Sequence, residues 1–160
     1  MKKILSIFIS LVTTFSFFSL NVGASFDDMP VPYVVDFSLT TGSDIDVNDV
    51  RATGLISSYG LSLSKNSITL NISGRTNGSV EVVRTGFKDL TVQRRASSAD
   101  AWEDYYEYGN LYVDAVMANL ETTLVVESGY QYRISCKHYA KKNLLSVQTI
   151  ANTSNIVTVS

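Results

Sequence analysis

The stretch Ser67-Ile-Thr-Leu-Asn-Ile-Ser73 alternates aliphatic and polar residues without a break. Successive side chains of a β-strand point to opposite faces of a sheet, so we expect Ile68, Leu70 and Ile72 on one face and their polar neighbours on the other. The segment Phe87–Arg95 continues the same period of two less cleanly. This period, repeated beyond residue 51, predicts an all-β fold.

Short segments rich in Gly, Asn and Ser separate the alternating runs, and these residue types tolerate tight or left-handed backbone. The expected turns are Ser64-Lys65-Asn66, Asn77-Gly78, Gly109-Asn110 and Ser128-Gly129. Many short strands joined by regular turns predict an antiparallel β-sandwich, with about seven to nine strands.

One region fits two periods. The apolar residues of Asn110–Glu121 also recur at helical spacing, and Asp100-x-x-Glu103 could cap a helix that runs through the following tyrosines. The same region is rich in Trp, Tyr and Val, which prefer strands. We therefore expect strands here as well.

The composition limits the chemistry. The chain has 160 residues, of which 45% are hydrophobic and 18% charged, with one Cys and one His. This describes one globular domain and excludes a disulfide framework or a zinc site built from several Cys or His ligands. No Gly-rich phosphate loop and no run of basic residues is present, so we expect no cofactor and no nucleic-acid partner.

The N-terminal residues 1–24 have the pattern of a secretory signal. Lys2 and Lys3 precede the uncharged apolar run Ile4–Leu20, and the small residues Val22 and Ala24 occupy the positions a signal peptidase needs. A transmembrane anchor is the alternative that the apolar length allows. The polar sequence that follows favours cleavage after Ala24, which predicts a secreted, extracellular protein with no stable membrane anchor.

Residues 25–50 contain acidic residues, no basic residue and both prolines of the chain. We interpret this segment as an extended leader or spacer, and place the β-sandwich domain at residues 51–160. Asp44-x-Asp46-x-Asn48 is like the start of a calcium loop. Asp49 stands where that loop needs Gly and Leu55 where it needs Glu, so no metal site is expected.

The segment Leu124–His138 carries the most specific pattern. Leu124 precedes Tyr130 by six residues, and Tyr130 follows the Ser128-Gly129 turn at the start of an alternating run. This arrangement resembles the corner between the fifth and sixth strands of immunoglobulin-like and fibronectin type III-like sandwiches. The resemblance implies that Tyr130 is structural and donates a hydrogen bond to upstream backbone. Cys136, two positions after Ile134, is expected to be a buried, reduced core thiol.

A wider resemblance extends from Ser67 to the C-terminus. Its motifs are ISGRT at 72–76, LTVQRR at 90–95, Trp102, GYQYR at 129–133 and His138. With these motifs the chain is similar to a family of short secreted proteins of Gram-positive bacteria that forms a domain of unknown function. The resemblance implies secretion and a β fold, and it transfers no catalytic residue.

The stretch AWEDYYEY at 101–108 is the best candidate for a binding surface. Aromatic rings stack on sugar C–H surfaces, and carboxylates accept hydrogen bonds from hydroxyl groups. The candidate ligand-binding residues are Trp102, Glu103, Tyr105, Glu107, Tyr108 and Tyr112. Simple alternation places Trp102, Tyr106 and Tyr108 on one side, where they could complete the core, and leaves Tyr105 and Glu107 on the other.

Two groups of residues offer catalytic alternatives. Cys136 and His138 form the one possible thiol–imidazole pair, but side chains two residues apart on a strand are roughly 6–7 Å apart, which is long for proton transfer. A glycoside hydrolase could draw its carboxylates from the acidic cluster Asp100, Glu103, Asp104 and Glu107.

Neither alternative provides a convergent catalytic set, so we expect no catalytic residue and no enzyme activity. The expected function is a secreted, non-catalytic β-sandwich that binds an extracellular glycan, wall polymer or protein. A small secreted hydrolase that uses His138 or the acidic cluster, and a structural surface protein without a soluble ligand, are the alternatives.

Overall fold

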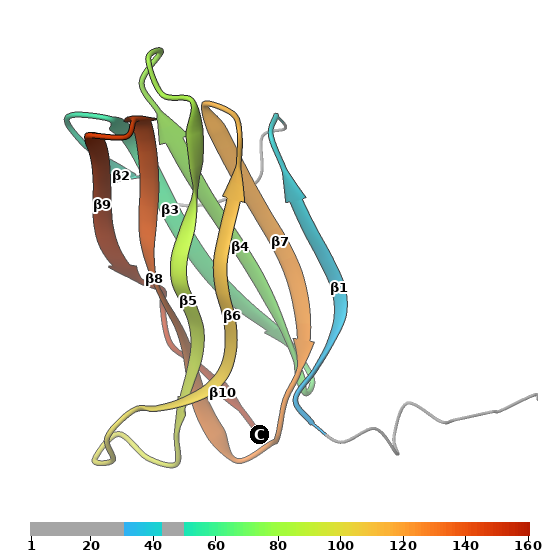
Figure 1. Ribbon diagram of the computed structural model, residues 1–160. Coiled ribbons are helices and arrows are strands. Elements are labelled where there is room, and N and C mark those ends of the chain that lie inside the picture. Colours follow the sequence, from blue (N-terminus) through green and yellow to red (C-terminus); the bar gives the residue numbers. More distant parts are fainter. Residues whose placement is uncertain (1–30, 43–49) are drawn as a thin grey trace, which may run out of the picture.

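A computed structural model describes residues 31–42 and 50–160 of the chain. Ten antiparallel strands form two five-stranded sheets that pack face to face as a β-sandwich (Figure 1). The strands are β1 (Tyr33–Thr40), β2 (Val50–Arg51), β3 (Ile56–Asn66), β4 (Thr69–Gly78), β5 (Arg84–Arg95), β6 (Glu103–Val113), β7 (Met117–Val125), β8 (Tyr130–Asn143), β9 (Ser146–Thr153) and β10 (Val157–Val159). The predicted antiparallel β-sandwich is confirmed, but residues 31–42 and 50–160 contain ten strands, where about seven to nine were expected.

The first sheet has the order β1-β7-β4-β3-β2, and the second has the order β10-β8-β5-β6 with β9 also paired to β8. The core between them consists of inward-facing residues of both sheets, as the period of two requires. Its fully buried side chains include Leu70, Ile72, Phe87, Leu90, Val92, Leu120, Leu124, Tyr132 and Ile134. No helix in the described part of the chain is long and apolar enough to span a membrane.

The strand prediction for residues 110–121 is confirmed, because β6 extends to Val113 and β7 begins at Met117. The turn predictions are correct at Ser128-Gly129, where Gly129 has φ 90°. They are wrong at Gly109-Asn110, which lies inside β6, with Gly109 at φ 74° opposite Leu90 in an irregular part of the ladder. A glycine at positive φ serves a bulge as well as a turn.

The first hairpin of the first sheet also differs from expectation. Residues 64–66 belong to β3, and the turn between β3 and β4 is formed by Ser67 and Ile68. Ile68 is therefore exposed at 43%, while Leu70 and Ile72 are buried as expected. Asn77-Gly78 ends β4 and is followed by the loop at 79–83.

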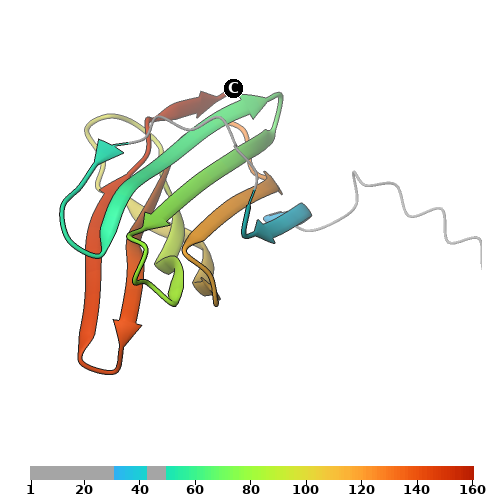
Figure 2. The same ribbon diagram turned by 90° about the horizontal axis from the view of Figure 1, so that it is seen from above.

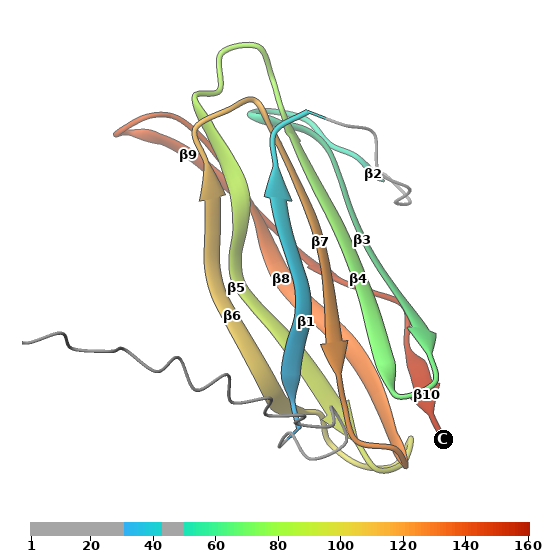
Figure 3. The ribbon, with the colours of Figure 1, turned by 90° about the vertical axis from the view of Figure 1, so that its right-hand side faces the viewer.

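The interpretation of residues 25–50 as a spacer is wrong for Tyr33–Thr40, which forms the edge strand β1 and pairs with β7 (Figure 3). Thr122 Oγ1 on β7 donates a 2.7 Å hydrogen bond to the carbonyl oxygen of Asp36, at a register shift in β1. Val34 packs against the core. The expected signal at 1–24 and the fragment Asp44-x-Asp46-x-Asn48 lie outside the described residues.

Two side-chain amides join the sheets along the β3 edge. Asn155 accepts a 3.0 Å hydrogen bond from the Leu63 N–H and donates a 2.7 Å bond to the Leu63 carbonyl. Gln148 on β9 accepts a 3.0 Å hydrogen bond from the Ile56 N–H and donates a 3.0 Å bond to the Thr53 carbonyl. These bonds satisfy edge groups that would otherwise be open to another strand. Figure 2 shows the β8–β9 hairpin projecting beyond the rest of the sandwich on this side.

Candidate functional site

The outward-facing surface of the β9-β8-β5-β6 sheet, named here the outer face, contains a shallow polar depression of about 240 Å³. It is lined by Asp89, Thr91, Gln93, Asp104, Ser135, Lys137 and Ala151, together with Cys136. The depression lies where β5 shifts register against both of its neighbours and Asp89 takes φ 53°. A bulge of this kind bends a strand and redirects its side chains.

The polar groups of the depression hold one another in place. Gln93 donates a 2.8 Å hydrogen bond to Asp104 Oδ1 and accepts a 2.8 Å bond from Arg133 Nε. Lys137 Nζ lies 2.8 Å from Asp89 Oδ2. The hydrogen bond from Lys137 holds the pKa of Asp89 below its usual value. The depression therefore offers an ordered set of carboxylate, amide, hydroxyl and ammonium groups.

An indole ring flanks the depression at one end. Trp102 is half-buried. The guanidinium groups of Arg95 and Arg133 lie over its rings, at 4.4 and 4.3 Å from the ring centroids. Arg95 Nε also donates a 2.8 Å bond to Gln131 Oε1. These cation–π contacts fix the aromatic plane on the outer face.

A pair of tyrosines flanks the other end. Tyr112 on β6 and Tyr139 on β8 both pair with Gly86 on β5, and their ring centroids lie 4.7 Å apart. A Cβ atom at Gly86 would lie 2.0 Å from the carbonyl oxygen of Leu111, so only glycine fits between the two strands. Burial raises the pKa of the Tyr112 hydroxyl, which stays protonated at neutral pH.

The structure divides the candidate ligand-binding residues between two faces. Trp102 and Tyr112 lie on the outer face, and the exposed Glu107 pairs with Thr91 beside the depression. Tyr105 and Tyr108 pack against the core instead.

Alternation alone is therefore wrong for Tyr105, which it leaves outside the core, and for Trp102, which it places on the same side as Tyr106 and Tyr108. Simple alternation assumes an unbroken ladder, whereas β6 shifts register against β5 between Val92 and Gln93 and again on both sides of Leu90. Each irregularity can change which face the following residues occupy.

The two inward tyrosines of β6 have separate structural roles. The ring of Tyr108 stacks on Phe37 at 6.2 Å, and its hydroxyl lies 3.2 Å from Thr122 Oγ1. The ring of Tyr105 meets Tyr132 edge-on at 5.6 Å. Neither ring is available to a ligand on the outer face.

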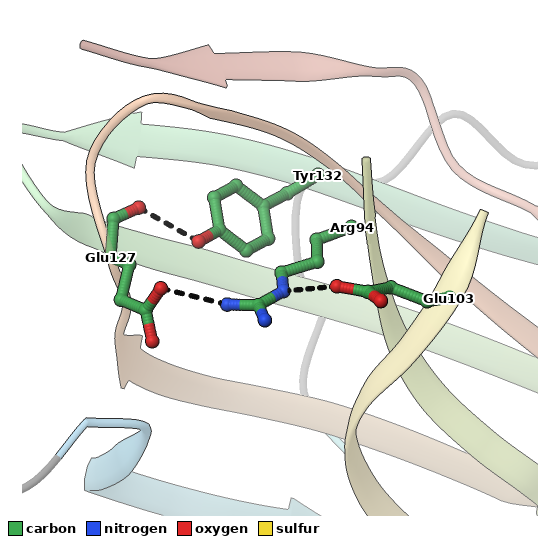
Figure 4. A network of polar contacts seen from close by, with 4 residues as sticks. All are labelled: Arg94, Glu103, Glu127 and Tyr132. Atoms are coloured by element: carbon green, nitrogen blue, oxygen red, sulfur yellow. Dashed lines mark hydrogen bonds and ion pairs between the residues drawn. The ribbon is translucent and has the colours of Figure 1, made fainter. Parts of the chain in front are cut away.

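Glu103 belongs to an ion-pair network at the end of the sandwich (Figure 4). Arg94 Nε lies 2.6 Å from Glu103 Oε1, and Arg94 Nη1 lies 2.8 Å from Glu127 Oε2. Burial alone would lower the pKa of Arg94, but the hydrogen bond to Glu103 and the charges of both carboxylates outweigh it and raise that pKa. The guanidinium also lies over the rings of Tyr105 and Tyr130, at 4.4 and 4.5 Å.

The corner hydrogen bond predicted for Tyr130 is made by Tyr132. The Tyr132 hydroxyl donates a 2.7 Å bond to the Glu127 carbonyl, and its ring is fully buried (Figure 4). Tyr130 begins β8 as expected, but it is only half-buried and packs under Arg94. Both tyrosines face the same side of β8, and the six-residue spacing from Leu124 selected the wrong one of the two.

The acidic residues at 100–107 do not share one role. Glu103 pairs with Arg94, and Asp104 accepts a bond from Gln93 on the outer face. Asp100 Oδ2 accepts hydrogen bonds from Ser97, at 2.8 Å from its backbone N–H and 2.7 Å from its hydroxyl. Each of these three carboxylates is held by a different partner.

The expected separation of Cys136 from His138 is wrong, because Cys136 Sγ lies 3.8 Å from His138 Nε2. Both side chains point into the core, where Cys136 is 3% exposed and His138 is fully buried. Rings of Tyr59 and Phe87 enclose the imidazole at 4.9 and 5.5 Å. The prediction of a buried Cys136 is confirmed, and burial raises the pKa of its thiol to about 12.

Polar groups from both sheets satisfy the buried imidazole. The Thr76 hydroxyl donates a 2.9 Å bond to the Gly86 carbonyl, so it accepts the 2.8 Å bond from His138 Nδ1. His138 Nε2 is then free to accept from Asn152 Nδ2 at 3.2 Å. Burial lowers the pKa of His138 to about 4, so the imidazole is neutral at physiological pH. A protonated thiol beside a neutral, enclosed imidazole is a packing arrangement rather than an activated nucleophile.

In residues 31–42 and 50–160, no three His, Cys, Asp or Glu side chains come together as a metal site. Comparison of the chain with family models, curated proteins and solved structures finds no match.

Proposed function

We propose that this protein is a secreted, non-catalytic module that binds an extracellular polysaccharide across its outer face. The observation that carries the proposal is the order of groups along that face: an indole, then a polar depression, then a tyrosine pair. Aromatic rings at both ends supply stacking surfaces, and the groups between them supply hydrogen bonds in both directions.

The dimensions of the face favour a polymer over a small ligand. Arg133, beside Trp102, and Tyr139 lie on one strand, and their separation in sequence corresponds to roughly 20 Å at the rise of an antiparallel strand. A shallow depression along such a length suits several linked sugar units. A small molecule would bury too little of its surface there to bind tightly.

Absence of catalysis is part of the proposal. The thiol and imidazole are enclosed in the core, and Glu103, Asp104 and Asp100 are held by separate partners. The hydrolase alternative predicts release of reducing ends from a bound polymer. Such turnover would show that the protein is an enzyme, but it would not contradict the assignment of the binding site to the outer face.

The extracellular location rests on the sequence of residues 1–24 and on the resemblance to secreted proteins of Gram-positive bacteria. Intact-mass measurement of protein from the culture supernatant should give a chain that begins at Ser25. Recovery only from membranes, with Met1 retained, would contradict secretion.

The binding test is retention on a panel of insoluble polysaccharides: peptidoglycan, chitin, cellulose and xylan. Trp102→Ala and Tyr139→Ala should each weaken retention about tenfold, the loss expected for one stacking contact. Phe37→Ala is the matched control, because Phe37 is an exposed aromatic residue on β1 of the other sheet. Equal effects of all three variants, or retention on no polymer, would count against the outer face as a glycan site.

A further inference from the structure

Two neighbouring loops at one end of the sandwich expose aliphatic side chains almost completely. Leu144 and Leu145, at the tip of the β8–β9 hairpin, are 86% and 97% exposed, and Val80 in the loop between β4 and β5 is 94% exposed. Figure 1 shows both loops at the same end of the molecule, and Figure 2 shows the hairpin tip beyond the sheets. Single exposed aliphatic residues are ordinary, but this group gathers at one projecting tip.

The two loops are held together by defined contacts. Lys142 Nζ lies 2.6 Å from Glu81 Oε2, and the Val83 N–H donates a 2.9 Å bond to the Lys141 carbonyl. Val82, between two exposed valines, is only 4% exposed and packs in a small core cluster. Val82 thus anchors its loop to the core and leaves Val80 exposed at the loop's outer end.

The hairpin turn does not require leucine. Leu144 and Leu145 occupy its two central positions, where Gly, Asn and Asp are the usual residues. The Leu145 N–H donates a 2.9 Å bond to Asn143 Oδ1, so the asparagine before the turn already stabilises it. Neither the turn nor the core explains why both projecting residues are apolar.

Basic residues adjoin the apolar tip. Lys141 and Lys142 directly precede the turn, and Arg84 begins β5 opposite Lys141. Lys142 pairs with Glu81 and Arg84 pairs with Asp114, so Lys141 is the basic residue that the charge argument uses. Long basic side chains beside a convex apolar tip can reach lipid phosphates while the apolar residues enter the layer beneath. A protein partner would require a broad complementary surface, whereas the interfacial layer of a bilayer accepts a narrow projection.

We propose that the tip formed by Val80, Leu144 and Leu145 inserts into the interfacial layer of a phospholipid bilayer, with Lys141 at the level of the phosphate groups. This site shares no residue with the polysaccharide site, although Tyr139 lies two residues before Lys141 on β8. Trp102 precedes β6 at the far end of the sandwich (Figure 1), so insertion leaves that part of the outer face open to a second ligand.

The test must report on the tip alone, because the apolar run at 4–20 of the full chain can itself bind lipid. The native chain contains one tryptophan, so Leu145→Trp in a Trp102→Phe background places the sole indole at the tip. Its emission should shift to the blue and be quenched several-fold by vesicles of brominated phosphatidylcholine and phosphatidylglycerol. Trp102 in the native chain should show neither change.

Vesicle affinity of the secreted chain that begins at Ser25, which lacks the apolar run, gives a second readout in variants at exposed positions. Leu144→Asn with Leu145→Asn should weaken vesicle binding by the tip about 100-fold, or about tenfold for each leucine withdrawn from the bilayer. Lys141→Gln should cost a few-fold on anionic vesicles and little on phosphatidylcholine alone. Val35→Asn, at an aliphatic residue of 55% exposure on β1, is the matched control and should have no effect.

Two results would overturn the proposal. One is that brominated lipid does not quench the fluorescence of the tryptophan at the tip although the chain binds the vesicles. The other is a blue shift that needs no vesicles and grows with protein concentration, which would assign the tip to contact with a second copy of the chain.

Discussion

Acidification to about pH 5 should destabilise this protein through His138, whose pKa is about 4 in the folded state against 6.5 in an unperturbed histidine. The unfolded chain binds the proton more readily, so the free energy of unfolding falls as the pH falls from about 6.5 towards 4. The expected loss is about 2 kcal/mol at pH 5 and about 3 kcal/mol once the pH is below 4. Above pH 6.5 the full contribution is present.

Urea unfolding at several pH values between about 7 and 5 measures this loss directly. Asp89 and Asp114 contribute little in that range. Their hydrogen bonds to Lys137 and Arg84 lower the pKa of each below the ordinary 3.8, so the stability they add is lost only as the pH falls towards and below that value. His138→Gln should be less stable at neutral pH and should show a nearly flat profile. An equally steep profile in that variant, or a flat one in the native protein, would refute the buried neutral imidazole.

Three further predictions concern packing. Tyr132→Phe should lower the free energy of unfolding by about 1 kcal/mol through loss of its hydrogen bond to the Glu127 carbonyl, whereas Tyr130→Phe should lower it by less than about 0.5 kcal/mol. If urea unfolding shows Tyr130→Phe to be the more destabilising of the two, Tyr130 makes the corner hydrogen bond. Cys136 should react with a thiol reagent far more slowly in the native than in the urea-unfolded protein, and equal rates would contradict its burial. Gly86→Ala should cost several kcal/mol in thermal or urea unfolding, because its Cβ would overlap the Leu111 carbonyl, and an unchanged midpoint would show that β5 and β6 can separate there.

The fold was predictable because its main determinant is local. Alternation in stretches such as 67–73 specifies strands, and the buried positions of Leu70, Ile72, Ile134 and Cys136 follow from it. Edge strand β1 was missed because its burial is weak: Val35 and Phe37 remain 55% and 44% exposed, so the strand shows little contrast between its faces.

The site was only partly predictable because register shifts depend on pairing between strands. Trp102 and Tyr112 were identified, but the bulges in β5 and β6 that turn Tyr105 inward depend on how those strands pair. Tyr139 and the depression itself went unrecognised for the same reason. The partner of His138, Thr76, lies 62 residues away on the opposite sheet, a distance at which no spacing rule applies.

The most direct measurement for the polysaccharide site uses the single native tryptophan. Trp102 fluorescence is recorded while soluble fragments of a retained polysaccharide are added. We predict a saturable change in emission whose midpoint matches the affinity found by calorimetry, and about tenfold weaker calorimetric affinity in Tyr139→Ala. Calorimetric binding that leaves Trp102 emission unchanged, with native affinity in Tyr139→Ala, would contradict the assignment of the outer face.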